Sequence, residues 1–198
     1  MRRITVTNHV TLDGVMQSPA HPDEDRRGGF DHGGWSVPYA DAVMGGVMAE
    51  GMAQARDLLL GRRTYEHFAA YWPHQTDDNP FTPVLNAAQK HVASRTLREP
   101  LPWVNSSLLE GDAADAVAAL KQQPGKDLVI LGSGELAQAL MRRNLIDEYL
   151  LTIHPLVLGA GRRLFEHPGA YATLRLVDAR TTTTGVIIAT YHSEEATR

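Results

Sequence analysis

Two short apolar runs, each ending in glycine and each followed at once by a helical segment, constrain the fold of this chain most. The first covers residues 57–61 and leads into residues 63–71, and the second covers 127–132 and leads into 135–143. Apolar runs of this length that end in glycine are typical of buried strands. Because strands that alternate with helices form sheets with parallel pairs, the sequence predicts an α/β fold.

The other segments extend this sheet and make it mixed. The hydrophobic pattern predicts strands at 3–9, 90–94, 103–105, 147–153, 173–181 and 185–192, and helices at 39–55 and 112–122. Asp112 is the expected N-cap of the last helix, and the β-branched run 181–184 before Gly185 indicates an antiparallel hairpin. We therefore predict one domain over residues 1–198, a three-layer α/β/α fold. Its central sheet is mixed and mostly parallel, with an antiparallel C-terminal hairpin.

Two segments have the composition of loops. Residues 17–38 are rich in Gly, Pro, Asp and His, and residues 73–83 form a second polar stretch that we expect to be exposed. A loop as long as the first is uncommon in a compact domain unless it serves a function.

Composition excludes several classes of protein. Nineteen Lys and Arg against 23 Asp and Glu give a net charge of −4, which disfavours nucleic acid as a partner. The chain has no cysteine, which excludes disulfides, a thiolate nucleophile and Cys-rich zinc sites. There is no apolar run of about 18 residues, and Met1 to Thr7 lacks the apolar core of a signal peptide. A cytoplasmic protein without a membrane partner is therefore expected.

Common catalytic and metal motifs are also missing. The nine histidines are scattered and form no His-Glu-x-x-His motif, so no metal site is predicted. There is no Gly-x-Ser-x-Gly motif either, which disfavours a serine hydrolase.

Both strand-to-helix corners have features of a phosphate site. The first contains Gly61, Arg62, Arg63 and Thr64, and the second contains Gly132, Ser133, Gly134, Glu135 and Leu136. Free N–H groups at a helix N-terminus attract phosphate, arginine adds guanidinium donors, and glycine allows close backbone approach. The spacing alone leaves open a second interpretation, in which these are ordinary structural corners with solvated arginines.

Three further parts of the sequence have both a ligand-binding and a purely structural interpretation. Ser94 and Arg95 follow a short strand, where they could hold another phosphate or simply form a solvated strand end. Asp41 precedes a helix in an aromatic loop with Trp35 and Tyr39, and it could act on a flat ligand or cap the helix. Asp13 could line the same pocket or stabilise a turn.

Together these segments resemble the dihydrofolate reductase superfamily. More closely, they resemble the branch that contains the C-terminal reductase domain of bifunctional riboflavin-biosynthesis deaminase/reductases and its stand-alone relatives. The resemblance runs from about residue 3 to about residue 192. The segments that carry it, in order, are 11–14 (TLDG), 59–66 (LLGRRTYE), 94–97 (SRTL), 130–136 (ILGSGEL), 146–155 (IDEYLLTIHP) and 158–165 (LGAGRRLF).

The resemblance implies an NADPH-dependent reductase, with the cofactor phosphates at both corners and at the Ser-Arg stretch. It places them at Gly61, Arg62, Arg63, Thr64, Ser94, Arg95, Gly132, Ser133, Gly134, Glu135 and Leu136. Asp41 would be the catalytic or anchoring carboxylate, with Asp13, Trp35 and Tyr39 binding the substrate. Relatives of this branch also suggest a homodimer.

The chain departs from the family pattern in three ways. Asp41 stands one residue later after the Trp-x-x-Pro motif than the acidic residue of dihydrofolate reductases, and the loop 17–38 is longer. The chain also lacks the His-x-Glu and Pro-Cys-x-x-Cys motifs of a deaminase domain. The expected substrate is therefore a small unsaturated heterocycle, pterin- or pyrimidine-like. A nucleotide-binding or regulatory module without turnover is the alternative.

Overall fold

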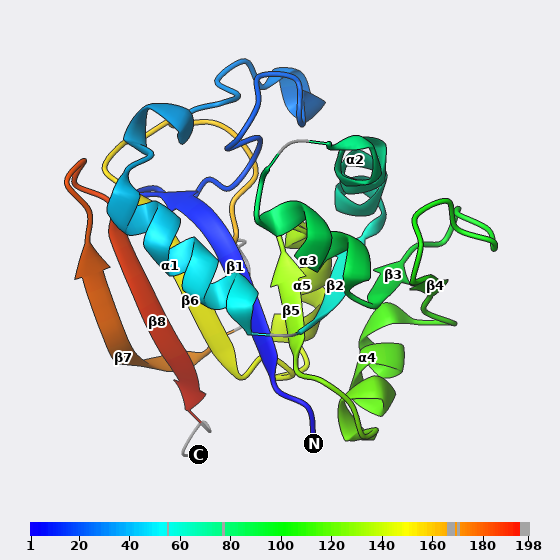
Figure 1. Cartoon of the computed structure of the whole chain (residues 1–198). Coiled ribbons are helices and arrows are strands. Elements are labelled where there is room, and N and C mark those ends of the chain that lie inside the picture. Colours follow the sequence, from blue (N-terminus) through cyan, green and yellow to red (C-terminus); the bar gives the residue numbers. More distant parts are fainter. Residues whose placement is uncertain (55, 77, 166–168, 170, 195–198) are drawn as a thin grey trace.

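Eight strands form one sheet in the order β4-β3-β2-β5-β1-β6-β8-β7 (Figure 1). The computed structural model describes residues 1–54, 56–76, 78–165, 169 and 171–194. The strands are β1 (Ile4–Thr11), β2 (Asp57–Gly61), β3 (Lys90–Ala93), β4 (Ser106–Leu108), β5 (Leu128–Leu131), β6 (Glu148–His154), β7 (Thr173–Thr181) and β8 (Ile187–Glu194). The first six strands form only parallel pairs with one another, and β8 is antiparallel to both β6 and β7.

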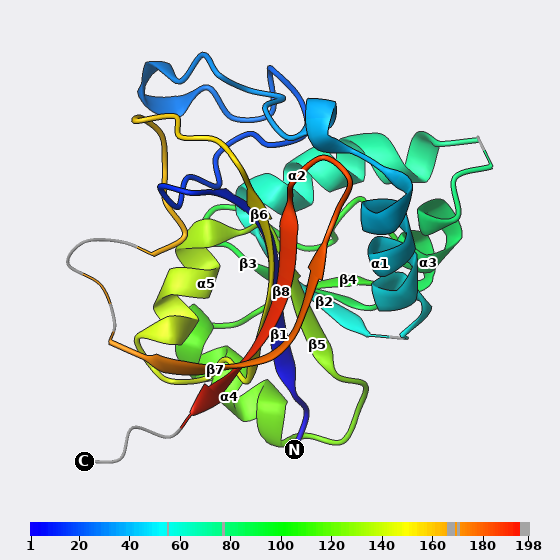
Figure 2. The same ribbon diagram turned by 90° about the vertical axis from the view of Figure 1, so that its left-hand side faces the viewer.

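Five α-helices in the described part of the chain cover the two faces of this sheet. They are α1 (Ala42–Ala53), α2 (Arg62–Tyr71), α3 (Phe81–Ala87), α4 (Ala113–Gln122) and α5 (Gly134–Met141). Figure 2 shows the sheet on edge, with α1 and α3 on one side and α4 and α5 on the other. None of the described helices is long and apolar enough to cross a membrane. The predicted three-layer α/β/α domain with a mixed, mostly parallel sheet and a C-terminal hairpin is confirmed.

Two large apolar clusters hold the helices against the sheet. On one face, Val117 of α4 and Leu140 of α5 pack with Ile4 and Val6 of β1. On the other face, Tyr65 of α2 and Leu85 of α3 pack with buried residues of β2 and β3, and Trp103 completes this cluster. Each fully buried large apolar side chain contributes about 1.5–3 kcal/mol, so these clusters fix the orientation of the helices.

The central strand β1 has one apolar face and one polar face. Ile4, Val6 and Val10 join the apolar cluster under α4 and α5, whereas Thr7 and His9 line a cavity on the side of α1. A polar strand face is usual where a sheet meets water, but β1 lies in the middle of this sheet. Its polar face therefore marks a cavity that the covering helix does not fill.

Two predictions of local structure are wrong. Within the predicted loop 73–83, a helix α3 begins at Phe81, because Phe81 and Leu85 pack into the cluster shared with α2. The strand predicted at 103–105 lies instead at Ser106–Leu108. Trp103 is a buried core residue and Asn105 has a left-handed backbone, with φ of 58°, so this segment is a turn.

The other elements lie close to their predicted positions. The helix predicted at 39–55 begins only at Ala42, after a 3-10 turn at Val37–Tyr39, and Ala55 lies outside the described residues. Asp112 caps α4 by accepting hydrogen bonds from the amides of Ala114 and Asp115, which confirms the predicted N-cap.

Candidate active site

A groove of 1320 Å³ lies along the carboxyl ends of the parallel strands. All eleven residues predicted to bind the cofactor line it. They come together because β2, β3 and β5 run parallel, so the turns that follow them lie at the same edge of the sheet. The groove exceeds the roughly 300–1,000 Å³ of common small-molecule sites, so its volume suits a cofactor together with a substrate.

The two strand-to-helix corners are hydrogen-bonded to each other. The Ser133 hydroxyl accepts from the Gly61 amide at 3.0 Å and donates to the Leu131 carbonyl at 3.0 Å. The Thr64 hydroxyl accepts from the Ser133 amide at 3.2 Å. Gly132 and Ser133 both have left-handed backbones, with φ of 58° and 50°. This geometry turns the chain sharply and starts α5 beside the first turn of α2.

These side-chain bonds leave the N-termini of α2 and α5 without side-chain caps. The unsatisfied N–H groups of a first helical turn and the helix dipole both favour an anion. Met16 lies over the start of α5, where a Cβ added to Gly134 would meet its sulfur at 2.7 Å. The corner therefore offers backbone donors in a confined space.

Two arginines on the groove wall are available for an anionic ligand. Arg63 and Arg95 are exposed, and neither has a hydrogen bond or ion pair with any described residue. Arg62, by contrast, pairs with Glu66 at 3.3 Å. The Ser94 hydroxyl accepts from the amides of Thr96 and Leu97, which holds the turn that carries Arg95.

The groove is positively charged although the whole chain is acidic. Among its lining residues are eight arginines, 27, 56, 62, 63, 95, 142, 162 and 163, and five carboxylates, 24, 25, 66, 112 and 135. Glu135 itself is held by Arg27 at 2.8 Å and Arg162 at 3.1 Å. The hydrogen bond from Arg27 holds the pKa of the Glu135 carboxyl below its ordinary value. Glu135 therefore ties two loops to α5.

At its other end the groove runs between α1 and the polar face of the sheet. Thr7 and His9 of β1, Thr152 of β6, and Met48 and Met52 of α1 line this end. It continues into a smaller charged pocket of 360 Å³, which shares Val47, Gly51, Gln54, Arg56, Leu150 and Ile188 with the groove.

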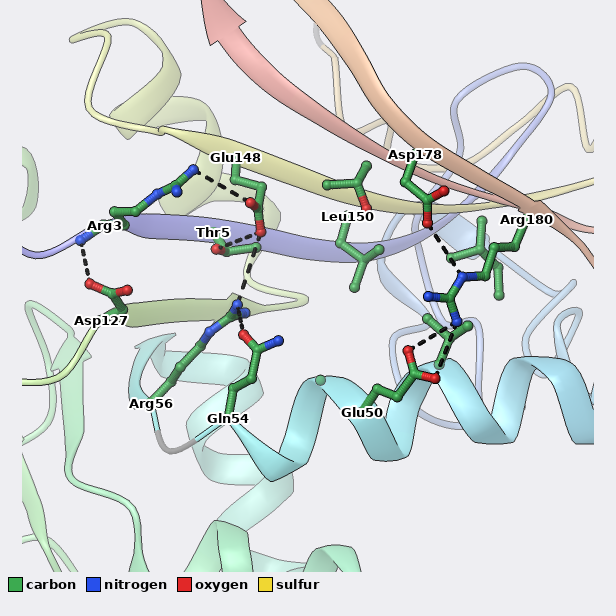
Figure 3. A pocket seen from close by; sticks show the side chains of 14 residues that line it. Arg3, Thr5, Glu50, Gln54, Arg56, Asp127, Glu148, Leu150, Asp178 and Arg180 are labelled. Carbon is green, nitrogen blue, oxygen red and sulfur yellow. Dashed lines mark hydrogen bonds and ion pairs between the residues drawn. The ribbon is translucent and has the colours of Figure 1, made fainter.

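Ion pairs join many of the side chains that line the charged pocket (Figure 3). Glu148 accepts from Thr5 at 3.2 Å and lies 3.5 Å from Arg3 and 4.0 Å from Arg56. Arg180 pairs with Glu50 at 2.9 Å. The charges in this pocket thus compensate one another.

The four residues predicted to meet the substrate do not line the groove. Asp41 caps α1 by accepting from the Met44 amide at 2.8 Å, and its second oxygen accepts from the Thr183 amide and hydroxyl, both at 2.7 Å. Its catalytic role stays a prediction that these contacts do not support.

Asp13, Trp35 and Tyr39 also make structural contacts. The Asp13 carboxylate accepts from the Thr11 hydroxyl at 2.6 Å and from the amides of Leu158 and Gly159. The Trp35 indole donates to the Gln17 carbonyl at 2.7 Å. Their predicted substrate contacts remain untested.

Sequence reasoning did not single out His9, one of the histidines that line the groove. His9 and His154 are hydrogen-bonded, and burial lowers the pKa of each to about 4, with His154 adding to the shift of His9. The sequence of β1 contains a signal that could have identified His9. Polar residues alternate with apolar ones there, although the neighbouring segments predict a strand buried within the sheet.

Comparisons with known proteins agree with this geometry. Residues 2–188 match the model of the RibD C-terminal domain family. The chain is 31% identical to the uncharacterized Bacillus subtilis protein YyaP over 197 residues, which covers 96% of this chain and 95% of YyaP. It is 32% identical to the Bacillus subtilis protein YwjB over 119 residues, or 60% of this chain and 63% of YwjB.

Solved structures share the fold. A protein from Shewanella sp. PV-4 attributed to riboflavin biosynthesis has a TM-score of 0.69 at 22% identity, covering 98% of this chain and 99% of its own. A pyrimidine reductase-like protein from Corynebacterium diphtheriae has a TM-score of 0.62 at 11% identity, covering 98% and 92%. Since the family model covers nearly the whole chain, a reductase-type role is supported, and the chain belongs to the RibD C-terminal domain family.

Proposed function

We propose that this protein is an NADPH-dependent reductase that transfers a hydride to a small unsaturated heterocycle, pterin- or pyrimidine-like. The observation that carries the proposal is the pair of interlocked corners beside Arg63 and Arg95, two exposed arginines that have no hydrogen bond with a described residue. They offer backbone donors for a pyrophosphate and guanidinium donors for a 2′-phosphate in one groove.

The residues of the groove fit such a cofactor. The amides in the first turns of α2 and α5, at 62–64 and 134–136, would hold the pyrophosphate, and Gly61, Gly132 and Ser133 would form the two corners that present them. Arg63 and Arg95 would hold the 2′-phosphate, with Ser94 holding the turn that carries Arg95. NADPH, when bound, supplies the hydride. The protein binds and orients both reactants, and the space beneath α1 accepts a planar substrate between Met48, Met52 and the polar face of β1.

Titration calorimetry with NADPH and NADH tests the cofactor assignment. We expect NADPH to bind at least about tenfold more tightly, because charge-assisted hydrogen bonds contribute about 1.5–3 kcal/mol each. Arg63→Gln and Arg95→Gln should each weaken NADPH by about tenfold and leave NADH nearly unchanged. Arg98→Gln is the matched control, since Arg98 is exposed and its side chain donates only to the Leu97 carbonyl within the described residues.

Turnover is tested separately, by following NADPH oxidation with a panel of pterin- and pyrimidine-like heterocycles. Oxidation with one of them supports the reductase. Equal dissociation constants for NADPH and NADH would contradict the 2′-phosphate site. Tight NADPH binding without oxidation by any compound would favour a nucleotide-binding module without turnover.

A further inference from the structure

Two histidines from neighbouring parallel strands meet at the substrate end of the groove. His9 of β1 and His154 of β6 are joined by a hydrogen bond of 2.9 Å between His9 Nδ1 and His154 Nε2. Their ring centroids are 5.2 Å apart. His9 lines the groove, whereas His154 is completely buried. The pair therefore links the groove to the protein interior.

The aromatic residues of the long loop enclose His154. The rings of Trp35 and Tyr39 pack against it edge-on, with centroid distances of 5.1 and 5.4 Å. The indole N–H is used by the Gln17 carbonyl. His154 Nδ1 is buried and has no hydrogen-bond partner among the residues that the structure describes. Trp35 and Tyr39 thus shape the groove indirectly, by holding His154 in place.

This environment determines where the protons lie. Both rings are neutral near pH 7, because burial lowers the pKa of each to about 4. Each neutral ring then carries one N–H and one lone pair. Orphaned N–H groups are rare in protein interiors, so the unpartnered Nδ1 of His154 carries the lone pair and its Nε2 carries the proton.

The same reasoning fixes the tautomer of His9. His154 Nε2–H donates to His9 Nδ1, which therefore acts as the acceptor, and the proton of His9 must be on Nε2. No described residue accepts a hydrogen bond from His9 Nε2. An N–H group that is buried without a partner destabilises a protein. His9 lines the groove, so a ligand in the groove can supply the partner that its Nε2–H lacks.

We propose that His9 is a substrate-binding residue whose Nε2–H donates a hydrogen bond to a carbonyl oxygen on the substrate ring. His154 is the positioning residue that keeps His9 in the donor tautomer. The inference rests on the proposed function only in assigning this end of the groove to the substrate. A donor at this place selects heterocycles that carry a carbonyl oxygen over those with an amino group at the same position.

The tautomers can be measured in the parent protein without any ligand. Two-bond ¹H–¹⁵N correlation spectra of protein labelled with ¹⁵N-histidine distinguish protonated from unprotonated ring nitrogens, and His154→Phe assigns the His154 signals. We expect a proton on Nε2 in both rings. A proton on Nδ1 of both rings would overturn the inference, because His9 would then offer the groove a lone pair.

A matched pair of probes tests recognition of the acceptor. Uracil carries carbonyl oxygens where 2,4-diaminopyrimidine carries amino groups, and the binding of each is followed by saturation-transfer NMR, with and without NADPH. We expect uracil to bind the parent about tenfold more tightly, the contribution of one hydrogen bond. Equal binding, tighter binding of 2,4-diaminopyrimidine, or no uracil binding up to its solubility would overturn the inference.

Two variants connect this preference to His9. In His9→Asn the side-chain oxygen can still accept from His154 Nε2, which keeps the buried bond, but no group takes the place of Nε2–H. We expect uracil binding to fall about tenfold. His9→Gln places an amide N–H near the position of Nε2 and should restore most of it. Unchanged uracil binding in a folded His9→Asn protein, checked by thermal melting, would overturn the role of His9.

These outcomes separate the inference from the proposed function. If NADPH fails to bind but the tautomers and the uracil preference are as expected, the reductase proposal fails and the donor role of His9 stands. If NADPH is bound and oxidised while the tautomers are reversed, the donor role fails and the reductase proposal stands.

Discussion

Asp41 joins the beginning of α1 to the turn between β7 and β8. One carboxylate oxygen accepts from the Met44 amide and the other from Thr183. The hydrogen bond from the Met44 amide, followed by that from the Thr183 hydroxyl, lowers the pKa of Asp41. The contacts depend on the ionised carboxylate, so they are present above the ordinary Asp pKa and are lost as the pH falls through the lower folded value.

A single variant separates this capping role from the predicted catalytic one. Asp41→Asn keeps an oxygen for Met44 but presents an N–H to the Thr183 amide, so we expect a lower melting temperature. NADPH affinity should stay within about twofold, because Asp41 lies outside the groove. Full turnover of the variant with an identified substrate would leave Asp41 as a capping residue. Loss of most turnover in a variant that is folded at the assay temperature would support the catalytic prediction.

Lys90 of β3 carries an amino group that is buried beside the sheet. Its Nζ donates to the carbonyls of Asn86, Ala88 and Val104 at 2.8–3.0 Å and lies 4.2 Å from the centre of the Trp103 ring. The side chain is completely buried, and this burial lowers its pKa to about 8. The carbonyls of Asn86 and Ala88 lie at the end of α3, and that of Val104 lies in the turn before β4. Lys90 therefore connects the end of α3 to the start of β4, two segments that the sequence patterns did not locate.

The shifted pKa makes stability depend on pH in a defined direction. Between about pH 8 and about pH 10.4 the unfolded chain keeps the Lys90 proton that the folded protein has lost, so the free energy of unfolding should rise with pH. Urea unfolding at about pH 7.5 and about pH 9.5 measures this change. Lys90→Met is the control, because it removes the titrating group. An equal pH dependence in the parent and in Lys90→Met would contradict the shift.

At the scale of elements, Ser133 connects two strand-to-helix units. Its hydroxyl satisfies the Gly61 amide at the end of β2 and the Leu131 carbonyl at the end of β5. Truncation would leave a partly buried N–H without its acceptor. The corner therefore depends on a side chain as well as on the backbone amides that would face the cofactor.

Ser133→Ala should therefore mainly reduce stability, whereas Gly134→Val should mainly reduce NADPH affinity. Ser133→Ala should lower the free energy of unfolding by about 1–3 kcal/mol, measured by urea unfolding, with a smaller loss of NADPH affinity. Gly134→Val should displace Met16 and crowd the site, and weaken NADPH at least about tenfold. The flexible end of Met16 can move, so the fold should tolerate the change. If Gly134→Val folds and binds NADPH like the parent, the pyrophosphate does not lie at this corner.

At the scale of the whole molecule, β7 leaves one edge of the sheet open. Among the strands that the structure describes, it pairs only with β8, and Leu176 and Val177 in its centre are 52% and 46% exposed. An exposed strand edge of nine residues can pair with another chain. This edge is the surface at which we expect the predicted homodimer to form.

Sedimentation velocity tests this expectation. The parent should sediment as a dimer, and Leu176→Lys should shift it to the monomer, because a buried charge at the edge opposes pairing. Val104→Lys is the control, since Val104 is 62% exposed and lies near β4 at the opposite edge. A monomeric parent, or a dimer unaffected by Leu176→Lys, would contradict this interface.

The sequence by itself determined the elements whose signals are local. Apolar runs that end in Gly61 and Gly132 predicted β2 and β5, Asp112 predicted the start of α4, and the alternation of strands and helices predicted a parallel sheet. That the residues predicted to bind the cofactor line one groove was predictable for the same reason. Each follows directly after its strand, and parallel strands bring such turns to one edge of the sheet.

Only the tertiary structure decided which polar residues face the groove. The Trp35–Asp41 segment has the composition of a binding loop, yet its side chains make structural contacts. Trp35 contacts Gln17 and His154, and Asp41 accepts hydrogen bonds from Met44 and Thr183. Sequence spacing cannot reveal such contacts. His9 and His154 are 145 positions apart and meet only because β1 and β6 pair in parallel. Helix α3 and the position of β4 depend likewise on packing around Trp103 and Lys90. Long-range pairing therefore decided which side chains line the groove, because the free energy that orders these side chains comes from partners distant in the chain.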